Sequence, residues 1–151
     1  MAANAQLRTI LLFTDGTEGS IRAAELAVLL ADTHDADLVA VAVVDTETLS
    51  MLLRQHILVD EEMAEFDTEL EASAERHLRM VTNHANRQGV PLETALLRGT
   101  CHSLVLAEAR RRGADLIVLS GFTTTMTRRD LLAKEKQYIV DDAPCPVVLV
   151  K

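Results

Sequence analysis

Residues 38–44 read LVAVAVV, an apolar run in which no polar residue alternates with the hydrophobic ones. A strand that faces water on one side shows such an alternation, whereas a strand covered on both faces does not. The run therefore predicts a strand of a parallel sheet that is enclosed between helices. A comparable run, RTILLFT at residues 8–14, ends at Asp15-Gly16 and predicts a second buried strand.

The rest of the chain alternates between helical and extended patterns on either side of these two runs. We expect helices at 18–33, 61–88, 101–112 and 127–140, an irregular connection at 46–60, and strands at 92–97, 115–120 and 146–150. This order predicts an α/β fold in one domain over residues 1–151, a doubly wound five-stranded parallel sheet with helices on both faces. Ligands of such sheets bind where the strand order reverses, and we expect the first and fourth strands to flank that crevice.

Composition excludes several classes of function. The chain has 151 residues and a formal net charge of -8, which argues against a nucleic-acid surface and against binding to anionic membranes. No signal peptide is recognisable, and the apolar runs are too short to span a bilayer. With two cysteines in the whole chain, a disulfide framework is not expected and a reducing cytoplasm is the predicted location.

The motifs give no positive argument for an enzyme. The chain contains no G-x-S-x-G elbow, no P-loop and no G-x-G-x-x-G sequence. Its five histidines lack the spacing of metal ligands, and no C-x-x-C pair accompanies them. We therefore predict no catalytic residues, no metal site and no enzymatic activity.

The segment 46–60 is unusually apolar for a connection between a strand and a helix. It contains Leu49, Met51, Leu52, Leu53, Ile57, Leu58 and Val59. Two interpretations stay open. These side chains form an exposed partner surface or lid, or they belong to a short helix that packs over the edge of the sheet.

Three stretches of the chain together resemble the universal stress protein family. They are ILLFTDGTEGSIRAAELAVLLA at residues 10–31, ADLIVLSG at residues 114–121 and DDAPCPVVLVK at residues 141–151. The resemblance covers nearly the whole chain and implies a five-stranded parallel sheet between helices. It also implies a homodimer through the last strand, formed by Val147, Val148, Leu149 and Val150. The absence of Lys or Pro from that edge strand favours the same pairing.

One branch of this family binds ATP through the motif G-x-x-G-x9-G-[ST] after the fourth strand. Here the four motif positions fall on Ser120, Thr123, Ala133 and Lys134. None of them is glycine, and the last is neither serine nor threonine. A side chain at a former glycine takes up room that the phosphates need. The chain therefore resembles the branch that lacks the motif.

Two other positions match residues with which the family contacts the nucleoside. Asp15 matches the aspartate that contacts the base or ribose, and Val43 matches a valine that packs on adenine. On spacing alone, Asp15 has a second interpretation, in which it starts a turn or caps the following helix. The altered loop still holds Thr123, Arg128 and Arg129, and hydroxyls and basic side chains at a helix start can bind anions.

These observations predict a cytoplasmic, non-enzymatic universal stress protein that acts through homodimerisation and contacts with partner proteins. We expect no cofactor, and weak or no ATP binding. The alternative is an ATP- or AMP-binding protein that acts as a nucleotide-dependent switch through an unconventional phosphate loop. The sequence does not identify the partner proteins.

Overall fold

The computed structural model describes residues 6–56, 60–121 and 131–151, which form ten elements of secondary structure. The strands are β1 (Thr9–Phe13), β2 (Asp37–Asp45), β3 (Leu92–Gly99), β4 (Leu116–Ser120) and β5 (Val147–Val150). The helices are α1 (Glu18–His34), α2 (Thr46–Arg54), α3 (Asp60–Arg87), α4 (Cys101–Arg112) and α5 (Leu131–Asp142). Among these described residues, no helix combines the length and the apolar character needed to cross a membrane.

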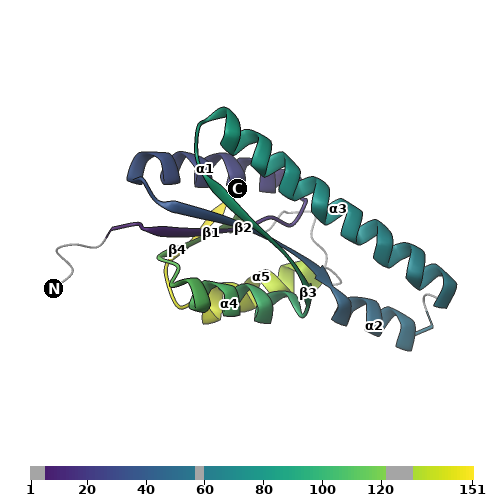
Figure 1. The fold of residues 1–151 in the computed structure, drawn as a ribbon. Helices are drawn as coiled ribbons and strands as arrows, with labels where there is room; N and C mark the ends of the chain where they lie inside the picture. The colour runs from purple at the N-terminus through teal and green to yellow at the C-terminus, as the bar shows by residue number, and fades with distance from the viewer. Residues whose placement is uncertain (1–5, 57–59, 122–130) are drawn as a thin grey trace.

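The five strands form one parallel sheet in the order β3-β2-β1-β4-β5 (Figure 1). β1 lies at the centre, where its last residue, Phe13, pairs with Val41 of β2 and Leu119 of β4. The connections leave β1 in opposite directions, so the strand order reverses between β1 and β4. The predicted fold class and the predicted position of the crevice are both confirmed.

Two layers of helices enclose the sheet. α1 and α3 cover one face, and α4 and α5 cover the other (Figure 1). Within β1, Ile10 and Leu12 point into the first layer, whereas Leu11 and Phe13 point into the second. All four side chains are buried, which explains why the central strands show no polar alternation.

For residues 46–54 the structure confirms the second interpretation of this segment, a short helix over the edge of the sheet, and they are not an irregular connection. Residues 46–54 form the helix α2, which packs against α3 and β3. Met51 and Leu53 are half-buried while Arg54 is exposed, so the apolar residues supply one side of a short amphipathic helix. The sequence left both interpretations open because nine residues are too few to show a clear helical period. Ile57, Leu58 and Val59 lie outside the described residues.

The remaining boundaries differ little from those predicted. β3 continues to Gly99, two residues beyond the expected end, and α5 continues to Asp142. Residues 127–130, the expected start of the last helix, lie outside the described part of the chain. α4 ends at Gly113, whose φ of 62° is the left-handed conformation that glycine adopts readily at a helix end.

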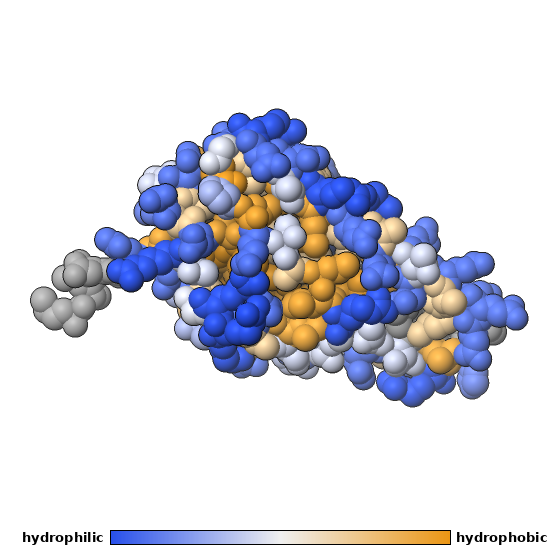
Figure 2. Space-filling model, in the orientation of Figure 1, coloured by the Kyte–Doolittle hydropathy of each residue, from blue (hydrophilic) through white to orange (hydrophobic). Residues whose placement is uncertain are grey.

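The edge strands of the sheet are β3 and β5, and within the described part of the chain no further strand pairs with either of them. Figure 2 shows an apolar area on the face where β3 runs between α3 and α4, and residues 95–97 of that strand are only partly buried. At the other edge, Leu149 is 39% exposed while Val148 and Val150 pack against the core under α1 and α3. The four residues predicted to form a dimer contact therefore lie along a free edge, but their side chains face different ways.

Candidate functional site

A polar cluster lies in the crevice between the carboxyl ends of β1 and β4. Asp15 follows β1, Thr17 precedes α1 and Ser120 ends β4. Lys136 reaches the same point from the second turn of α5. Because parallel strands carry their carboxyl ends to one edge of the sheet, this topology gathers side chains from both halves of the sequence.

Asp15 and Lys136 form a buried ion pair. The Lys136 ammonium lies 2.5 Å from Asp15 Oδ2, and the side chains of Lys136 and Asp15 are 0% and 1% exposed. The ammonium also donates to Ser120 Oγ at 2.8 Å and approaches the carbonyl oxygen of Gly121 at 3.5 Å. An ammonium has three hydrogens to donate, and here it meets three acceptors.

The carboxylate of Asp15 is equally well occupied. Its Oδ1 accepts from the backbone N–H of Thr17 at 2.9 Å and from Thr17 Oγ1 at 2.6 Å, and its Oδ2 accepts from Ser120 Oγ at 2.7 Å. Burial raises the pKa of Asp15, but the hydrogen bonds from Lys136, Thr17 and Ser120 outweigh it, and the pKa lies below its usual value. The carboxylate is therefore ionised at neutral pH. The sequence also allowed Asp15 to start a local turn. That turn is present, because Thr17 donates to Asp15 Oδ1, and it occurs together with the long-range pairing to Lys136.

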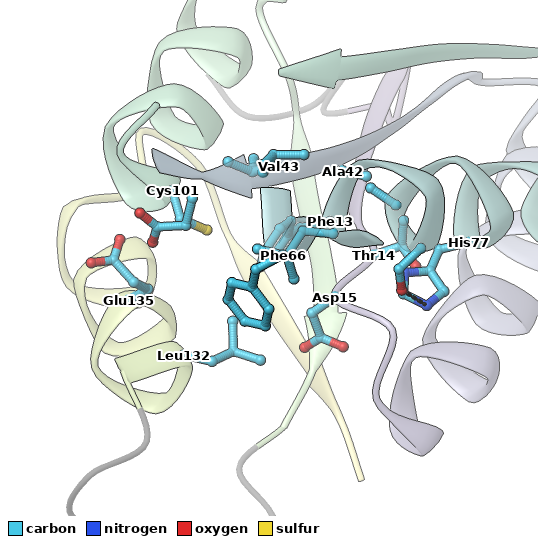
Figure 3. A pocket seen from close by; sticks show the side chains of 15 residues that line it. Phe13, Thr14, Asp15, Ala42, Val43, Phe66, His77, Cys101, Leu132 and Glu135 are labelled. Atoms are coloured by element: carbon cyan, nitrogen blue, oxygen red, sulfur yellow. Dashed lines mark hydrogen bonds between the residues drawn. The ribbon is translucent and has the colours of Figure 1, made fainter. Parts of the chain in front are cut away.

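A pocket of about 270 Å³ opens beside the crevice, beyond the carboxyl ends of β1 and β2. Figure 3 shows Val43 of β2 on one side of it and Asp15 and Leu132 on the other, with Phe66 of α3 between them. The lining is mostly apolar. It consists of Phe13, Thr14, Asp15, Ala42, Val43, Val44, Asp45, Phe66, Leu70, Ser73, Ala74, His77, Cys101, Leu132 and Glu135.

Thr14 brings an unpaired hydroxyl to the pocket. Its side chain is buried, with 2% of the residue exposed, and Oγ1 has no hydrogen-bond partner among the described residues. Its backbone N–H is satisfied by the carbonyl oxygen of Val41 at 2.9 Å. Buried polar atoms are nearly always paired, so this hydroxyl is an exception among the residues that line the pocket.

His77 closes the side of the pocket next to Gly16. Gly16 has a φ of 77°, and a Cβ at this position would lie 1.9 Å from His77 Cε1. Burial lowers the pKa of His77, the charge of Arg76 lowers it further, and Asp15 opposes both effects. The imidazole is therefore neutral at pH 7, with Ser73 Oγ 3.5 Å from its Nε2.

On the opposite wall, Glu135 joins α5 to the start of α4. Its Oε2 lies 2.6 Å from His102 Nδ1 and accepts from the backbone N–H of His102 at 2.7 Å. A carboxylate at a helix N-terminus stabilises the helix, so this contact caps α4. The Tyr138 ring lies 4.7 Å from the His102 ring. Burial, reinforced by Glu135, raises the pKa of Cys101, so the thiol facing the pocket is protonated.

The structure places the residues predicted from the sequence at different distances from this site. Asp15 and Val43 line the pocket, and Ser120 belongs to the crevice cluster. Ala133 is half-buried and Lys134 is exposed on α5, and neither lines the pocket. Thr123 lies outside the described residues.

Sequence reasoning missed Lys136, although a signal was present. Leu132, Lys136 and Ile139 are spaced by four and three residues, which places them on one face of α5. Ile139 is fully buried, and so is Lys136. A lysine in the apolar stripe of a helix needs a buried partner, because an unpaired charge there is very unfavourable.

Comparison with known proteins identifies one family. The universal stress protein family matches residues 6–151. The universal stress protein MJ0531 of Methanocaldococcus jannaschii is 30% identical over 146 residues, which are 95% of this chain and 82% of that protein. A universal stress protein of Thermus aquaticus is 31% identical over 147 residues, which are 95% of this chain and 98% of that protein.

Solved structures show the same fold. The universal stress protein UspA from Lactobacillus plantarum has a TM-score of 0.77 at 27% identity, with 98% of this chain and all of that chain covered. A universal stress protein in complex with cAMP has a TM-score of 0.70 at 18% identity, covering 96% and 97% of the two chains. One from Archaeoglobus fulgidus in complex with dAMP has a TM-score of 0.65 at 13% identity, covering 97% and 99%.

Proposed function

Because this chain belongs to the universal stress protein family, we propose that it is a non-enzymatic stress-response protein of the cytoplasm that binds ATP weakly or not at all. It acts through homodimerisation and contacts with other proteins. The observation that carries the proposal is the ion pair between Asp15 and Lys136, which engages the side chain expected to contact a nucleoside.

A nucleotide meets two obstacles in this site. A carboxylate offers about four positions to hydrogen-bond donors, and Asp15 uses them for Thr17, Ser120 and Lys136. A ribose hydroxyl must therefore displace an internal donor. In addition, Ser120, Ala133 and Lys134 bring side chains to positions where the ATP-binding branch has glycine or a small hydroxyl residue.

The state of the pocket side chains supports a role without catalysis. The Cys101 thiol is protonated because burial raises its pKa, and a protonated thiol is a poor nucleophile. His102 Nδ1 lies against Glu135 Oε2, which also accepts from the backbone N–H of His102 and so holds the start of α4. These groups stabilise the wall of the pocket.

The free edge of β5 supports homodimerisation. Its strand is short and apolar, and an uncovered edge of this kind pairs readily with a second strand. Antiparallel pairing with an identical strand gives a twofold symmetric contact. Each residue of the strand then occurs twice in the contact, once from each chain. Leu149 is the residue of this strand with the most exposed side chain, so Leu149→Lys should weaken the dimer.

Light scattering tests this assembly. The unmodified protein is expected to be a dimer and Leu149→Lys to shift it toward the monomer. Leu29→Lys is the matched control, because Leu29 is 59% exposed on α1, away from the edge of the sheet. A monomeric unmodified protein, or equal effects of the two substitutions, would contradict assembly through β5.

A thermal-shift titration tests the ATP proposal. If ATP bound with a dissociation constant of about 10 μM, about 1 mM ATP would stabilise the fold by roughly 2.7 kcal/mol. For a domain of this size that is a rise in Tm of roughly 5–10 °C. We expect a rise under about 2 °C. Phosphate release, measured on the same samples, checks for hydrolysis, which we expect to be absent.

A specific observation favours AMP binding as the second candidate function. The pocket has apolar walls for a base and, in Thr14, an unpaired buried hydroxyl for a polar edge. Two proteins of the same fold are known in complex with cAMP and with dAMP. A titration with AMP that gave a large shift in Tm, where ATP gave none, would favour this candidate over a role limited to protein contacts.

A further inference from the structure

The crevice and the pocket share one side chain, Asp15, and its carboxylate makes all of its hydrogen bonds within the crevice. The crevice consists of Asp15, Thr17, Ser120 and Lys136, whose polar atoms bond to one another. It is also tightly closed, because a Cβ at Gly19 of α1 would lie 3.1 Å from Ser120 Cβ. An external ligand can therefore use Asp15 only by breaking internal contacts.

We propose that Lys136 is a specificity-determining residue, an internal cation that occupies Asp15 in place of a ligand hydroxyl and keeps the crevice closed whether or not the pocket is filled. This inference rests on the proposed function, since it explains why a site of this position binds a nucleoside weakly. It adds that Lys136 is the obstacle to the nucleoside part of the ligand, and that substitution of Lys136 removes this obstacle.

The geometry accounts for the strength of this occupation. The ammonium reaches the carboxylate at 2.5 Å and its remaining hydrogens go to Ser120 and Gly121. Both charges are removed from water, and at such sites a pair of opposite charges is held much more firmly than at the surface. A neutral ribose hydroxyl offers a weaker hydrogen bond than this ammonium, and it cannot neutralise the buried carboxylate.

The test is a binding cycle with adenosine as the probe. Lys136→Thr shortens the side chain and removes its charge, which leaves Asp15 Oδ2 open to a ligand hydroxyl. We expect adenosine to bind Lys136→Thr at least about tenfold more tightly than the unmodified protein, the equivalent of one hydrogen bond to a charged group. In the double variant Asp15→Asn/Lys136→Thr that gain should disappear, because the acceptor carboxylate is gone.

Arg79→Thr provides the matched control. Arg79 is exposed on α3, so this variant loses one positive charge without altering the crevice, and its affinity for adenosine should not change. No gain in a folded Lys136→Thr protein would overturn the inference. A gain that persists in the double variant would also overturn it, since Lys136 would then act by volume and not through Asp15.

A measurement on the unmodified protein covers the case in which Lys136→Thr does not fold. A buried, fully bonded ammonium exchanges its protons slowly, so nitrogen-detected NMR should show a protected lysine signal that persists with saturating adenosine and with ATP. Loss of the signal on adding either compound, or its absence from the free protein, would overturn the inference. Tight ATP binding with the signal intact would contradict the proposed function and, with it, the weakness that Lys136 is inferred to cause. Weak ATP binding together with no gain in Lys136→Thr would overturn this inference alone.

Discussion

The crevice and the pocket lie side by side at the same edge of the sheet, yet they are built in opposite ways. The crevice is filled by the protein's own charges, and Asp15, Ser120 and Lys136 satisfy one another. The pocket is open and mostly apolar, and the hydroxyl of Thr14 in its wall has no partner among the described residues. The difference separates two kinds of construction: the polar groups of the crevice are satisfied within the protein, whereas the pocket leaves the Thr14 hydroxyl without a partner among the described residues.

Lys136→Met gives the largest effect expected from this comparison. Methionine keeps most of the side-chain volume but leaves the Asp15 carboxylate buried without its cation. Breaking a buried ion pair from one side costs about 3–5 kcal/mol. Denaturant unfolding should show a loss of this size in the free energy of unfolding.

The double variant Asp15→Asn/Lys136→Met is the control for that loss. It removes both charges at similar volume, and replacing a buried ion pair as a whole is often nearly neutral. Most of the stability should therefore return. If the single and double variants were equally unstable, the crevice would be held by packing and not by the pairing of charges.

Gly16→Ala tests the boundary between the two regions. The added Cβ would lie 1.9 Å from His77 Cε1, and the φ of 77° is unfavourable for any side chain by about 1–2 kcal/mol. We expect a loss of at least that size in the free energy of unfolding. Combining it with His77→Ala removes the collision but not the backbone strain, so part of the loss should be recovered. Full recovery would show that φ contributes nothing at this turn.

The same contrast explains what could be predicted from sequence. The central strands were predictable because residues 10–13 and 38–44 are apolar without alternation, a composition typical of enclosed parallel strands. The order of strands and helices then led to a crevice between β1 and β4. Asp15 follows a buried strand at that edge, and it was identified as a site residue through the resemblance to the universal stress protein family.

Local patterns did not settle two features. Lys136 lies on the apolar face of α5, but it was missed because lysine is almost always a surface residue. Its partner Asp15 is distant in the sequence and approaches only in the folded chain. The helix α2 stayed one of two open interpretations because nine apolar and polar residues fit a loop, a lid or one side of a short helix equally well. In both cases the deciding contact is tertiary.

Thr14→Val tests whether the pocket wall is built at a cost in stability. An unpaired buried hydroxyl is unfavourable, and its replacement by a methyl group of similar shape should raise the free energy of unfolding by about 1 kcal/mol. Thr82→Val is the matched control, because Thr82 Oγ1 already donates to the carbonyl oxygen of Leu78 at 2.8 Å. A gain at Thr82 and none at Thr14 would mean that the Thr14 hydroxyl is satisfied in solution.

The smallest effect concerns pH, and its sign follows from Asp15. Its pKa in the folded protein lies below the ordinary value of 3.8, so the folded state favours the ionised carboxylate more than the unfolded state does. Asp15 therefore contributes stability that is fully present above about pH 5 and is lost as the pH falls through the folded-state pKa. Between pH 7 and about pH 5 we expect no change from this group.

Other carboxylates contribute to acid unfolding as well, so the measurement is the difference in free energy of unfolding between the unmodified protein and Asp15→Asn/Lys136→Met, taken from urea unfolding curves at a series of pH values. That difference should be constant down to about pH 5. At lower pH the unmodified protein should lose stability relative to the double variant. A difference independent of pH down to acid unfolding would show that the Asp15 carboxylate gains nothing from Lys136, Thr17 and Ser120 in the folded state, and the contrast between a self-satisfied crevice and an unsatisfied pocket would fail.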